Sequence, residues 1–414
     1  MTWPDSALSK SCPVRQLTRQ MITLWRKPGE RGRTTERSGR AIVALVIILL
    51  LGTPGLEAAA GGQTVHTVLH NFVGGLGDGA NPHGDLTLSG DTLYGMTYQG
   101  GRLNRGTIFT MNTDGTGFAV LRSFAGAEGA YPYGSLTLFG STLYGMTGAG
   151  GSSDNGSIFK INTNGTGYAV LHSFTGKDGA HPSGSLVLSG STLYGMTSTS
   201  GGNDNGTIFT MNIDGSGYAV LHTFMLTDGA YPYGSLICSG NTLYGMTSAG
   251  GNDNGTIFKI NTDGKRFTVL HRFAWTEGAY PLGSLTISGS TLYGMTSAGG
   301  AGAYGTIFKT DTDGKSFTVL HSFTGNGRAT PCGSLTISGS ALYGMTSDYR
   351  SASGNGAIFK ITIDGTSFTV LHSFAWTDGM YPYGSLTLSG PTLYGMTRAG
   401  GSRGDGTVFS VSGW

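Results

Sequence analysis

Short apolar and β-branched runs, separated by glycine-rich polar segments, make up the chain from residue 65 onward. In one stretch these runs cover residues 134–140, 141–147, 156–161 and 168–174. Runs of this length predict β-strands, and the Asn-Gly and Asp-Gly pairs between them supply the positive φ that hairpin turns need. The long apolar periodic runs that suit helices are missing after residue 60. The pattern therefore predicts an all-β fold.

The same pattern recurs along the chain as a repeat. Its marker is the segment Leu-Tyr-Gly-Met-Thr, whose tyrosine falls at positions 94, 144, 194, 244, 293, 343 and 394. A regular period of about 50 residues is typical of solenoids and propellers. In the second copy Leu143 and Gly145 should face one way and Tyr144 and Met146 the other, because strand side chains alternate. Apolar residues on both faces of a sheet require a neighbour on each side, as radially packed blades provide.

The two ends of the repeat region are offset. Residues 65–72 (VHTVLHNF) match an isolated fourth strand, and residues 406–411 (GTVFSV) match a third strand with no fourth strand after it. We predict that the first segment completes the last sheet, since closure removes two exposed sheet edges and an open solenoid would need caps. Residues 61–414 are thus predicted to form a seven-bladed β-propeller with four antiparallel strands in each blade.

The repeat also resembles a known family. Its consensus reads GSLTLSGSTLYGMT, followed by GGNDNGTIFKINTDGTGYTVLHSF, and residues 184–224 show it best. This consensus resembles the bacterial tandem-repeat family called GloVer, and every repeat in residues 65–411 matches. The resemblance implies an exported, propeller-like protein, and it carries over no activity and no residue roles. The chain ends at Trp414 without a sorting segment, which favours release over surface anchoring.

Residues 1–60 have the composition of an export leader. Residues 41–51 (AIVALVIILLL) are apolar, arginines including Arg31 and Arg40 precede them, and three alanines end at Ala60. A basic segment, a short apolar core and a small-residue cleavage site predict a secretory signal peptide. Eleven helical residues span roughly 16 Å, less than the ~30 Å of a bilayer core. We expect a secreted or extracytoplasmic protein, with a membrane tether by an uncleaved signal anchor as the alternative.

Charge and cysteine content exclude several functions. Residues 1–60 hold nine Lys/Arg and four Asp/Glu, whereas the remaining chain holds 16 and 19 and is slightly acidic. Such a domain offers no basic surface for nucleic acid. Of the three cysteines, Cys12 lies in the leader, and Cys238 and Cys332 occupy different positions of non-neighbouring repeats. Neither a disulfide framework nor a cysteine-based zinc site is predicted.

Aromatic residues recur in the loops that join the fourth strand of one repeat to the first strand of the next. We expect these loops to lie on one face, round the mouth of the central channel, because strand order places the two tight turns on the other face. Tyrosine and tryptophan commonly stack on sugars or anchor a protein partner, although the same side chains could instead pack the joints between blades. The candidate ligand-binding residues are Tyr131, Tyr133, Tyr231, Tyr233, Tyr280, Tyr381, Tyr383, Trp275 and Trp376.

Two sets of polar residues recur in the repeats. Acids precede a glycine in six of the fourth-to-first loops, where they are expected to organise their own turns. Six histidines, with Arg122 in the remaining repeat, occupy one position of the fourth strand. Because these strands are the outermost in separate blades, their histidines cannot converge on one ion. The Asp-Gly turns lack the downstream glutamate of a calcium loop. No metal and no cofactor are predicted.

Catalysis needs unlike groups gathered at one point, whereas near-identical repeats supply the same group seven times. The main departures from the repeat are Asp85, Arg122 and residues 328–332, and they form no recognisable catalytic set. We therefore predict a monomeric, exported binding module for a glycan or a surface protein. Two alternatives remain open: a structural component of the cell envelope without a specific ligand, and a hydrolase or lyase with its site at the channel mouth.

Overall fold

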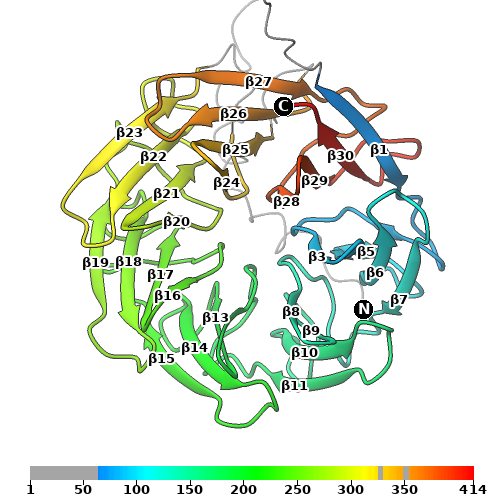
Figure 1. Ribbon diagram of the computed structural model, residues 1–414. Coiled ribbons are helices and arrows are strands. Elements are labelled where there is room, and N and C mark those ends of the chain that lie inside the picture. The colour runs from blue at the N-terminus through cyan, green and yellow to red at the C-terminus, as the bar shows by residue number, and fades with distance from the viewer. Residues whose placement is uncertain (1–63, 325–329, 348–353) are drawn as a thin grey trace, which may run out of the picture. The chain divides into compact units, whose positions relative to one another are not determined.

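In the computed structural model, the residues described are 64–324, 330–347 and 354–414. The predicted leader, residues 1–60, lies outside them, as does Arg328. The part of the chain from Ala60 onward forms one unit, in which seven four-stranded antiparallel sheets surround a central channel (Figure 1). Nothing in the described residues forms a helix long and apolar enough to cross a membrane. The predicted seven-bladed propeller is confirmed.

In six blades the strands run outward from the channel in chain order, and the last blade takes its outermost strand from the start of the propeller. The first strands are β3 (Thr87–Ser89), β8 (Thr137–Phe139), β12 (Val187–Ser189), β16 (Ile237–Ser239), β20 (Thr286–Ser288), β24 (Thr336–Ser338) and β28 (Thr387–Ser389). The second strands are β4 (Thr92–Thr97), β9 (Thr142–Thr147), β13 (Thr192–Thr197), β17 (Thr242–Thr247), β21 (Thr291–Thr296), β25 (Ala341–Thr346) and β29 (Thr392–Thr397). The third strands are β6 (Thr107–Asn112), β10 (Ser157–Asn162), β14 (Thr207–Asn212), β18 (Thr256–Asn261), β22 (Thr306–Asp311), β26 (Ala357–Thr362) and β30 (Thr407–Ser412).

The fourth, outermost strands include the first strand of the chain. They are β7 (Ala119–Ser123), β11 (Ala169–Ser173), β15 (Ala219–Thr223), β19 (Thr268–Arg272), β23 (Phe317–Ser322), β27 (Phe368–Ser373) and β1 (Val65–Asn71). A further two-stranded pair joins β2 (Gly79–Ala80) to β5 (Gln99–Gly100).

The ring closes as the offset ends predict. Strand β1 pairs antiparallel with β30, and Val65 lies opposite Ser412 while Asn71 lies opposite Thr407. The last blade therefore has the order β1-β30-β29-β28 and combines both ends of the repeat region. Figure 1 shows the blue β1 beside the red β30. Strand β1 therefore serves as the fourth strand of the last blade. In the other blades the fourth strand follows the third strand directly along the chain.

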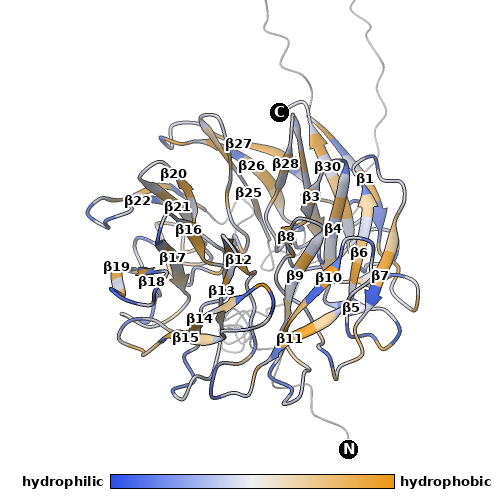
Figure 2. Ribbon diagram, turned by 60° about the horizontal axis from the view of Figure 1, so that its bottom comes forward, coloured by the Kyte–Doolittle hydropathy of each residue, from blue (hydrophilic) through white to orange (hydrophobic). Residues whose placement is uncertain are grey.

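The hydrophobic core lies between neighbouring blades. Leu143 packs in one cluster with residues of the preceding blade, and Tyr144 and Met146 pack in another with the following blade. The predicted alternation is thus confirmed. Figure 2 shows apolar residues along the strands and polar residues in many of the connecting loops. Because each sheet buries both faces, no blade has an apolar core of its own.

Two glycines in each repeat permit close packing. A Cβ at Gly145 would lie 2.5 Å from the Cζ atom of Phe159, so the phenylalanine ring occupies the place of a side chain. A Cβ at Gly134 would lie 2.1 Å from the carbonyl oxygen of Gly184 in the next blade. The first strand is also shorter than predicted, because residues 134–136 contact the neighbouring blade and do not continue the ladder.

Candidate binding surface at the channel mouth

A ring of hydrogen bonds lines the channel where the first strands approach its axis. At this position each backbone N–H donates to a side-chain oxygen of the next blade, and the serine acceptors lie at 2.6 to 2.8 Å. The ring closes across the seam, where the Ser385 N–H donates to the Asp85 carboxylate. Its members are Asp85, Ser135, Ser185, Ser235, Ser284, Ser334 and Ser385.

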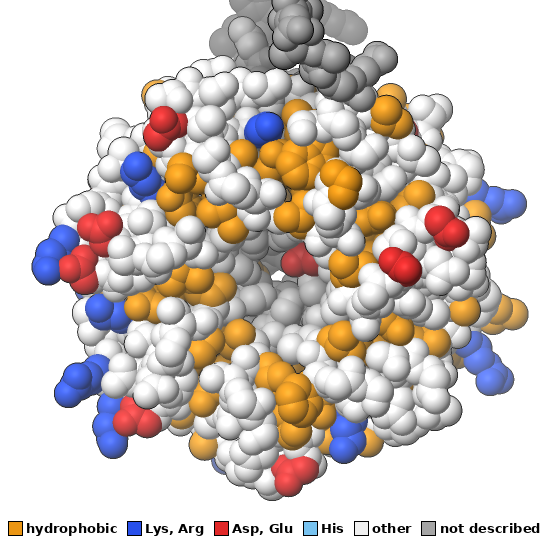
Figure 3. Space-filling view, in the orientation of Figure 1, with side chains coloured by type: hydrophobic (Ala, Val, Ile, Leu, Met, Phe, Trp, Pro, Cys, Tyr) orange, Lys and Arg blue, Asp and Glu red, His pale blue; other side chains and the backbone are white. Residues whose placement is uncertain are grey.

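Asp85 is the one acid in this ring. Burial raises the pKa of its carboxyl, and hydrogen bonds from Ser385 and Ser135 oppose the shift. The channel cavity here has a volume of about 400 Å³. Figure 3 shows the central opening with hydrophobic side chains gathered round it, and acidic side-chain atoms visible inside it. The wall therefore combines aliphatic side chains with hydroxyl groups and a single carboxyl.

The loops before the first strands hold a left-handed residue immediately ahead of a proline. Tyr131, for example, has φ 55°, and the other members of the set have φ between 52° and 82°. The Tyr131 N–H donates to the Arg105 carbonyl of one blade, and its own carbonyl accepts from the Gly148 N–H of the next. The members are Asn81, Tyr131, His181, Tyr231, Tyr280, Thr330 and Tyr381. Because different side chains occupy the same turn, the turn does not require tyrosine.

Aromatic rings from three adjacent blades meet at one part of this loop face. The His83 ring lies 5.0 Å from the rings of both Tyr133 and Tyr383, one in each neighbouring blade. Tyr98 lies 5.1 Å from His83, 4.8 Å from Tyr133 and 5.1 Å from Tyr131. We call this continuous group the aromatic cluster: His83, Tyr98, Tyr131, Tyr133 and Tyr383.

One cation accompanies the aromatic cluster. The Arg398 guanidinium lies over the Tyr383 ring, 5.5 Å from its centroid. In the part of the chain that the structure describes, Arg398 forms no ion pair. Its Nε atom and the Nε2 atom of His83 are buried and have no hydrogen-bond partner. The cluster thus keeps an uncompensated positive charge next to stacked rings.

Burial controls the ionisation of the cluster. Together with a smaller contribution from the nearby Arg398 charge, it lowers the pKa of His83 to about 3. Burial, together with the neighbouring Tyr133 and Tyr131, raises the pKa of Tyr98. His83 and Tyr98 are therefore both neutral at physiological pH, and Arg398 carries the charge.

The remaining predicted residues lie outside the aromatic cluster, although Trp376 and Tyr381 share the β27–β28 connection with the cluster residue Tyr383. Tyr231 and Tyr233 are half-buried in the β15–β16 connection. Trp275 is 45% exposed, and its ring centroid lies 6.2 Å from that of Tyr280 in an edge-to-face arrangement. Trp376 is 55% exposed. Among the predicted residues, the structure connects Tyr131, Tyr133 and Tyr383 into one surface.

Sequence reasoning missed Tyr98 and Arg398 and left His83 off the candidate set. Tyr98 and Arg398 directly follow the Leu-Tyr-Gly-Met-Thr segment, where the other repeats carry Gly or Ser. Alignment of the repeats at this one position would have found both. Tyr98 belongs to the first blade and Arg398 to the last, and closure of the ring places these two blades side by side.

The fold and this surface define the class of protein: a seven-bladed β-propeller with an aromatic, cationic cluster on its loop face. The chain belongs to the Gloeobacter/Verrucomicrobia repeat family, whose model matches residues 57–252 and 140–354. No curated protein shows significant sequence similarity to it.

Several solved structures share the fold. An oligogalacturonate lyase from Vibrio parahaemolyticus has a TM-score of 0.54 at 13% identity, over 85% of this chain and 98% of the lyase. The GH74 enzyme of Niastella koreensis has a TM-score of 0.51 at 16% identity, over 71% and 46%. A puromycin-hydrolysing peptidase from Mycobacterium tuberculosis has a TM-score of 0.50 at 12% identity, over 77% and 50%. At such identities the likeness concerns the fold alone.

Proposed function

We propose that the protein is an exported binding module that holds a carbohydrate chain on its aromatic cluster. The observation that carries this proposal is the continuous set of rings from three blades, with Arg398 unpaired beside it. Aromatic faces stack on the apolar faces of sugar rings, while phenol and guanidinium groups bind hydroxyls or an acidic substituent. Export rests on the predicted leader in residues 1–60.

The alternative, that these rings only pack the joints between blades, has less support. The positions of Tyr133 and Tyr383 hold Ser183, Leu282 and Cys332 in other repeats, and those joints keep the same buried proline and strand order. The fold therefore tolerates small residues where the cluster has rings. A function that uses the rings accounts for their concentration on one side of the mouth.

A hydrolase or lyase is a second candidate, because unlike polar groups do gather here: His83, Tyr98 and Arg398. Their ionisation argues against acid–base work. A general acid or base is most effective with a pKa near the working pH. Burial instead moves the pKa of His83 down to about 3 and that of Tyr98 upward. Binding fits these neutral groups better than proton transfer does.

The test is binding of the full chain to a panel of neutral and acidic polysaccharides, followed by titration calorimetry with the best oligosaccharide. Two residues of the aromatic cluster and the neighbouring Arg398 are each replaced by the residue that another repeat carries at the same position: Tyr98→Ser, Tyr133→Ser and Arg398→Ser. We expect each change to weaken binding roughly tenfold, in line with the loss of one stacking or charged contact, with little change in melting temperature.

The matched control is Tyr231→Thr, which exchanges a tyrosine in the same turn at a joint outside the cluster. It should bind the oligosaccharide like the unmodified protein. If the three cluster variants bind normally, or if Tyr231→Thr loses binding equally, the cluster is not the binding surface.

A further inference from the structure

Stacked side chains join the outer strands of neighbouring blades. At each joint a histidine or arginine of one fourth strand lies on an aromatic ring of the next, and the His222 and Phe267 rings, for example, are 3.8 Å apart and 8° from parallel. At most joints an acid also pairs with this base, as Asp228 does with His222 at 3.2 Å. The six ordinary pairs are His70–Phe118, Arg122–Tyr168, His172–Tyr218, His222–Phe267, His271–Phe317 and His321–Phe368.

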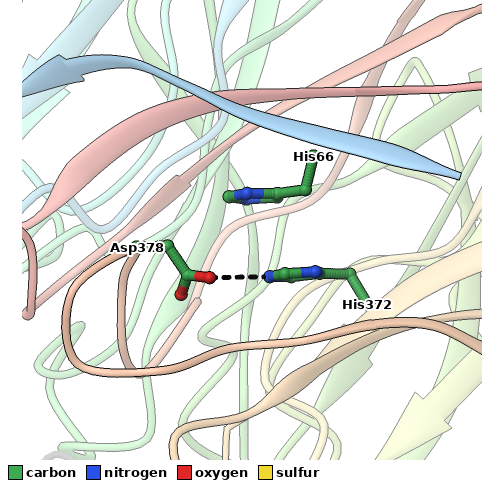
Figure 4. A group of neighbouring side chains, drawn as sticks. All are labelled: His66, His372 and Asp378. Carbon is green, nitrogen blue, oxygen red and sulfur yellow. Dashed lines mark hydrogen bonds and ion pairs between the residues drawn. The ribbon is translucent and has the colours of Figure 1, made fainter.

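The joint between the sixth blade and the last blade, which β1 completes, differs by one residue. Here β1 supplies His66 where the other joints have Phe or Tyr, and its ring lies 3.9 Å from the His372 ring at an angle of 4°. Asp378 Oδ2 lies 3.1 Å from His372 Nε2 (Figure 4). One ligand atom from each of the three residues falls within 4.8 Å of the others. This joint thus gathers two imidazoles and a carboxylate from two blades.

Both imidazoles are in the ionisation state that a metal ion requires. Burial, with a smaller contribution from His372, lowers the pKa of His66 to about 4, and burial also lowers the pKa of His372. Both imidazoles are therefore neutral at pH 7, so each has one nitrogen lone pair. The Nε2 atom of His66 is buried and has no hydrogen-bond partner among the described residues. His372 donates its Nε2–H to Asp378 Oδ2, so its lone pair lies on Nδ1, and a metal ion at Nε2 requires that proton to move to Nδ1. Asp378 Oδ1 accepts the Ala375 N–H at 2.7 Å.

We propose that His66, His372 and Asp378 bind a divalent transition-metal ion, such as Zn²⁺, at the joint between the sixth blade and the last blade. Two imidazoles and a carboxylate with a water molecule in the fourth position are a common zinc ligand set. This site revises the prediction that the protein has no metal site, a prediction made from the six repeated histidines without His66.

Binding the ion requires a small rearrangement. The two rings are parallel and stacked, so their lone pairs run side by side and do not point at one ion. The His66 ring has to turn out of the stack, and Asp378 Oδ2 has to exchange His372 for the metal. The bound ion would then connect β1 to β27 in the neighbouring blade. An ion that binds only the closed ring stabilises the ring by mass action.

The experiment is titration of the full, tag-free chain with Zn²⁺ by calorimetry, and with Co²⁺ by visible absorption, all in a Cys12→Ser background that removes the leader thiol. We expect one ion per chain, the absorption bands of cobalt bound to nitrogen and oxygen, and a higher melting temperature with Zn²⁺. His66→Phe should lower the affinity by roughly tenfold or more. It should leave the metal-free melting temperature nearly unchanged, because phenylalanine occupies this position at other joints.

A gain-of-function variant makes the test independent of damage to the fold. Phe267→His places a second histidine beside His222 and Asp228, in the same stacked arrangement, and should raise the stoichiometry from one ion to two. The proposal is overturned if the unmodified protein binds no stoichiometric Zn²⁺, or if His66→Phe binds Zn²⁺ with unchanged affinity.

Discussion

At the scale of single residues, a pair of buried hydroxyls illustrates how the repeats differ. In six blades the threonine that ends the second strand shares a hydrogen bond of 2.8 to 3.0 Å with a hydroxyl at the start of the third strand. The remaining blade, the sixth, has Ala357 opposite Thr346, and the Thr346 Oγ1 atom is buried without a hydrogen-bond partner among the described residues. A buried polar atom without a hydrogen bond costs free energy.

Ala357→Ser should restore this hydrogen bond. We expect the free energy of unfolding to rise by about 1 kcal/mol, because the new hydroxyl replaces a missing partner in a place where Ser157 fits in another blade. Urea denaturation followed by fluorescence measures the change. The converse variant, Ser157→Ala, should cost roughly 1–3 kcal/mol, since it removes a partner of Thr147. An unchanged midpoint for Ala357→Ser would mean that Thr346 is already satisfied.

At the scale of elements, the joint between β1 and β27 combines packing with ionisation. Burial among Phe374, Phe409 and His372 keeps His66 neutral in the folded state. The pKa of His66 is about 4 in the folded protein and near 6.5 in the unfolded chain. Between these values the unfolded chain binds a proton that the folded protein does not. The contribution of His66 to the free energy of unfolding is therefore fully present above about pH 6.5, and it is lost as the pH falls toward 4.

His66→Phe should make the propeller less sensitive to acid. With EDTA present to exclude metal, the free energy of unfolding of the unmodified protein should fall between pH 7 and pH 5. The variant should lose about 1 kcal/mol less over the same interval, a figure that allows for solvent screening of a partly exposed joint. Denaturant titrations at the two pH values measure both slopes. If the free energy of unfolding falls equally in both proteins between pH 7 and pH 5, protonation of His66 does not destabilise the closed ring.

At the scale of the whole molecule, closure of the ring depends on pairing and not on where the chain begins. Val65 lies opposite Ser412, so the two ends of the propeller stand where the other blades have a hairpin turn. The turn after Asn261, which contains the exposed Asp263, joins β18 to β19 in the same way. Moving the chain ends from one such turn to another conserves every pair of blade strands.

A circular permutant of residues 64–414 tests this conclusion. Residue 412 is joined to residue 65 by a short turn, and the chain is opened between Asp263 and Gly264. We expect a monomer that melts within a few degrees of the unpermuted domain, as measured by calorimetry and size exclusion. Deletion of residues 64–72 is the contrasting variant. It leaves β30 with an exposed edge and should cause aggregation. A permutant that fails to fold would show that closure depends on chain order.

The sequence by itself determined the architecture. These features are local or repeated: the period, the alternation of Leu143 and Tyr144, and the offset ends. Each copy of the repeat therefore predicts the same blade, and the equal number of strands of each type predicts a closed ring. Departures such as Tyr98, Arg398, Ala357 and His66 can be seen in aligned repeats, but their partners cannot.

Only the tertiary structure decided which departures meet. His83 contacts Tyr383 because closure places the first blade beside the last, and His66 contacts His372 because β1 completes the last blade, which lies beside the sixth. The hydrogen-bond ring likewise crosses the seam from Ser385 to Asp85. The physical reason is that repetition specifies the shape of each unit through local strand and turn chemistry, whereas a site is made of unlike side chains. Their distance depends on how the complete ring closes.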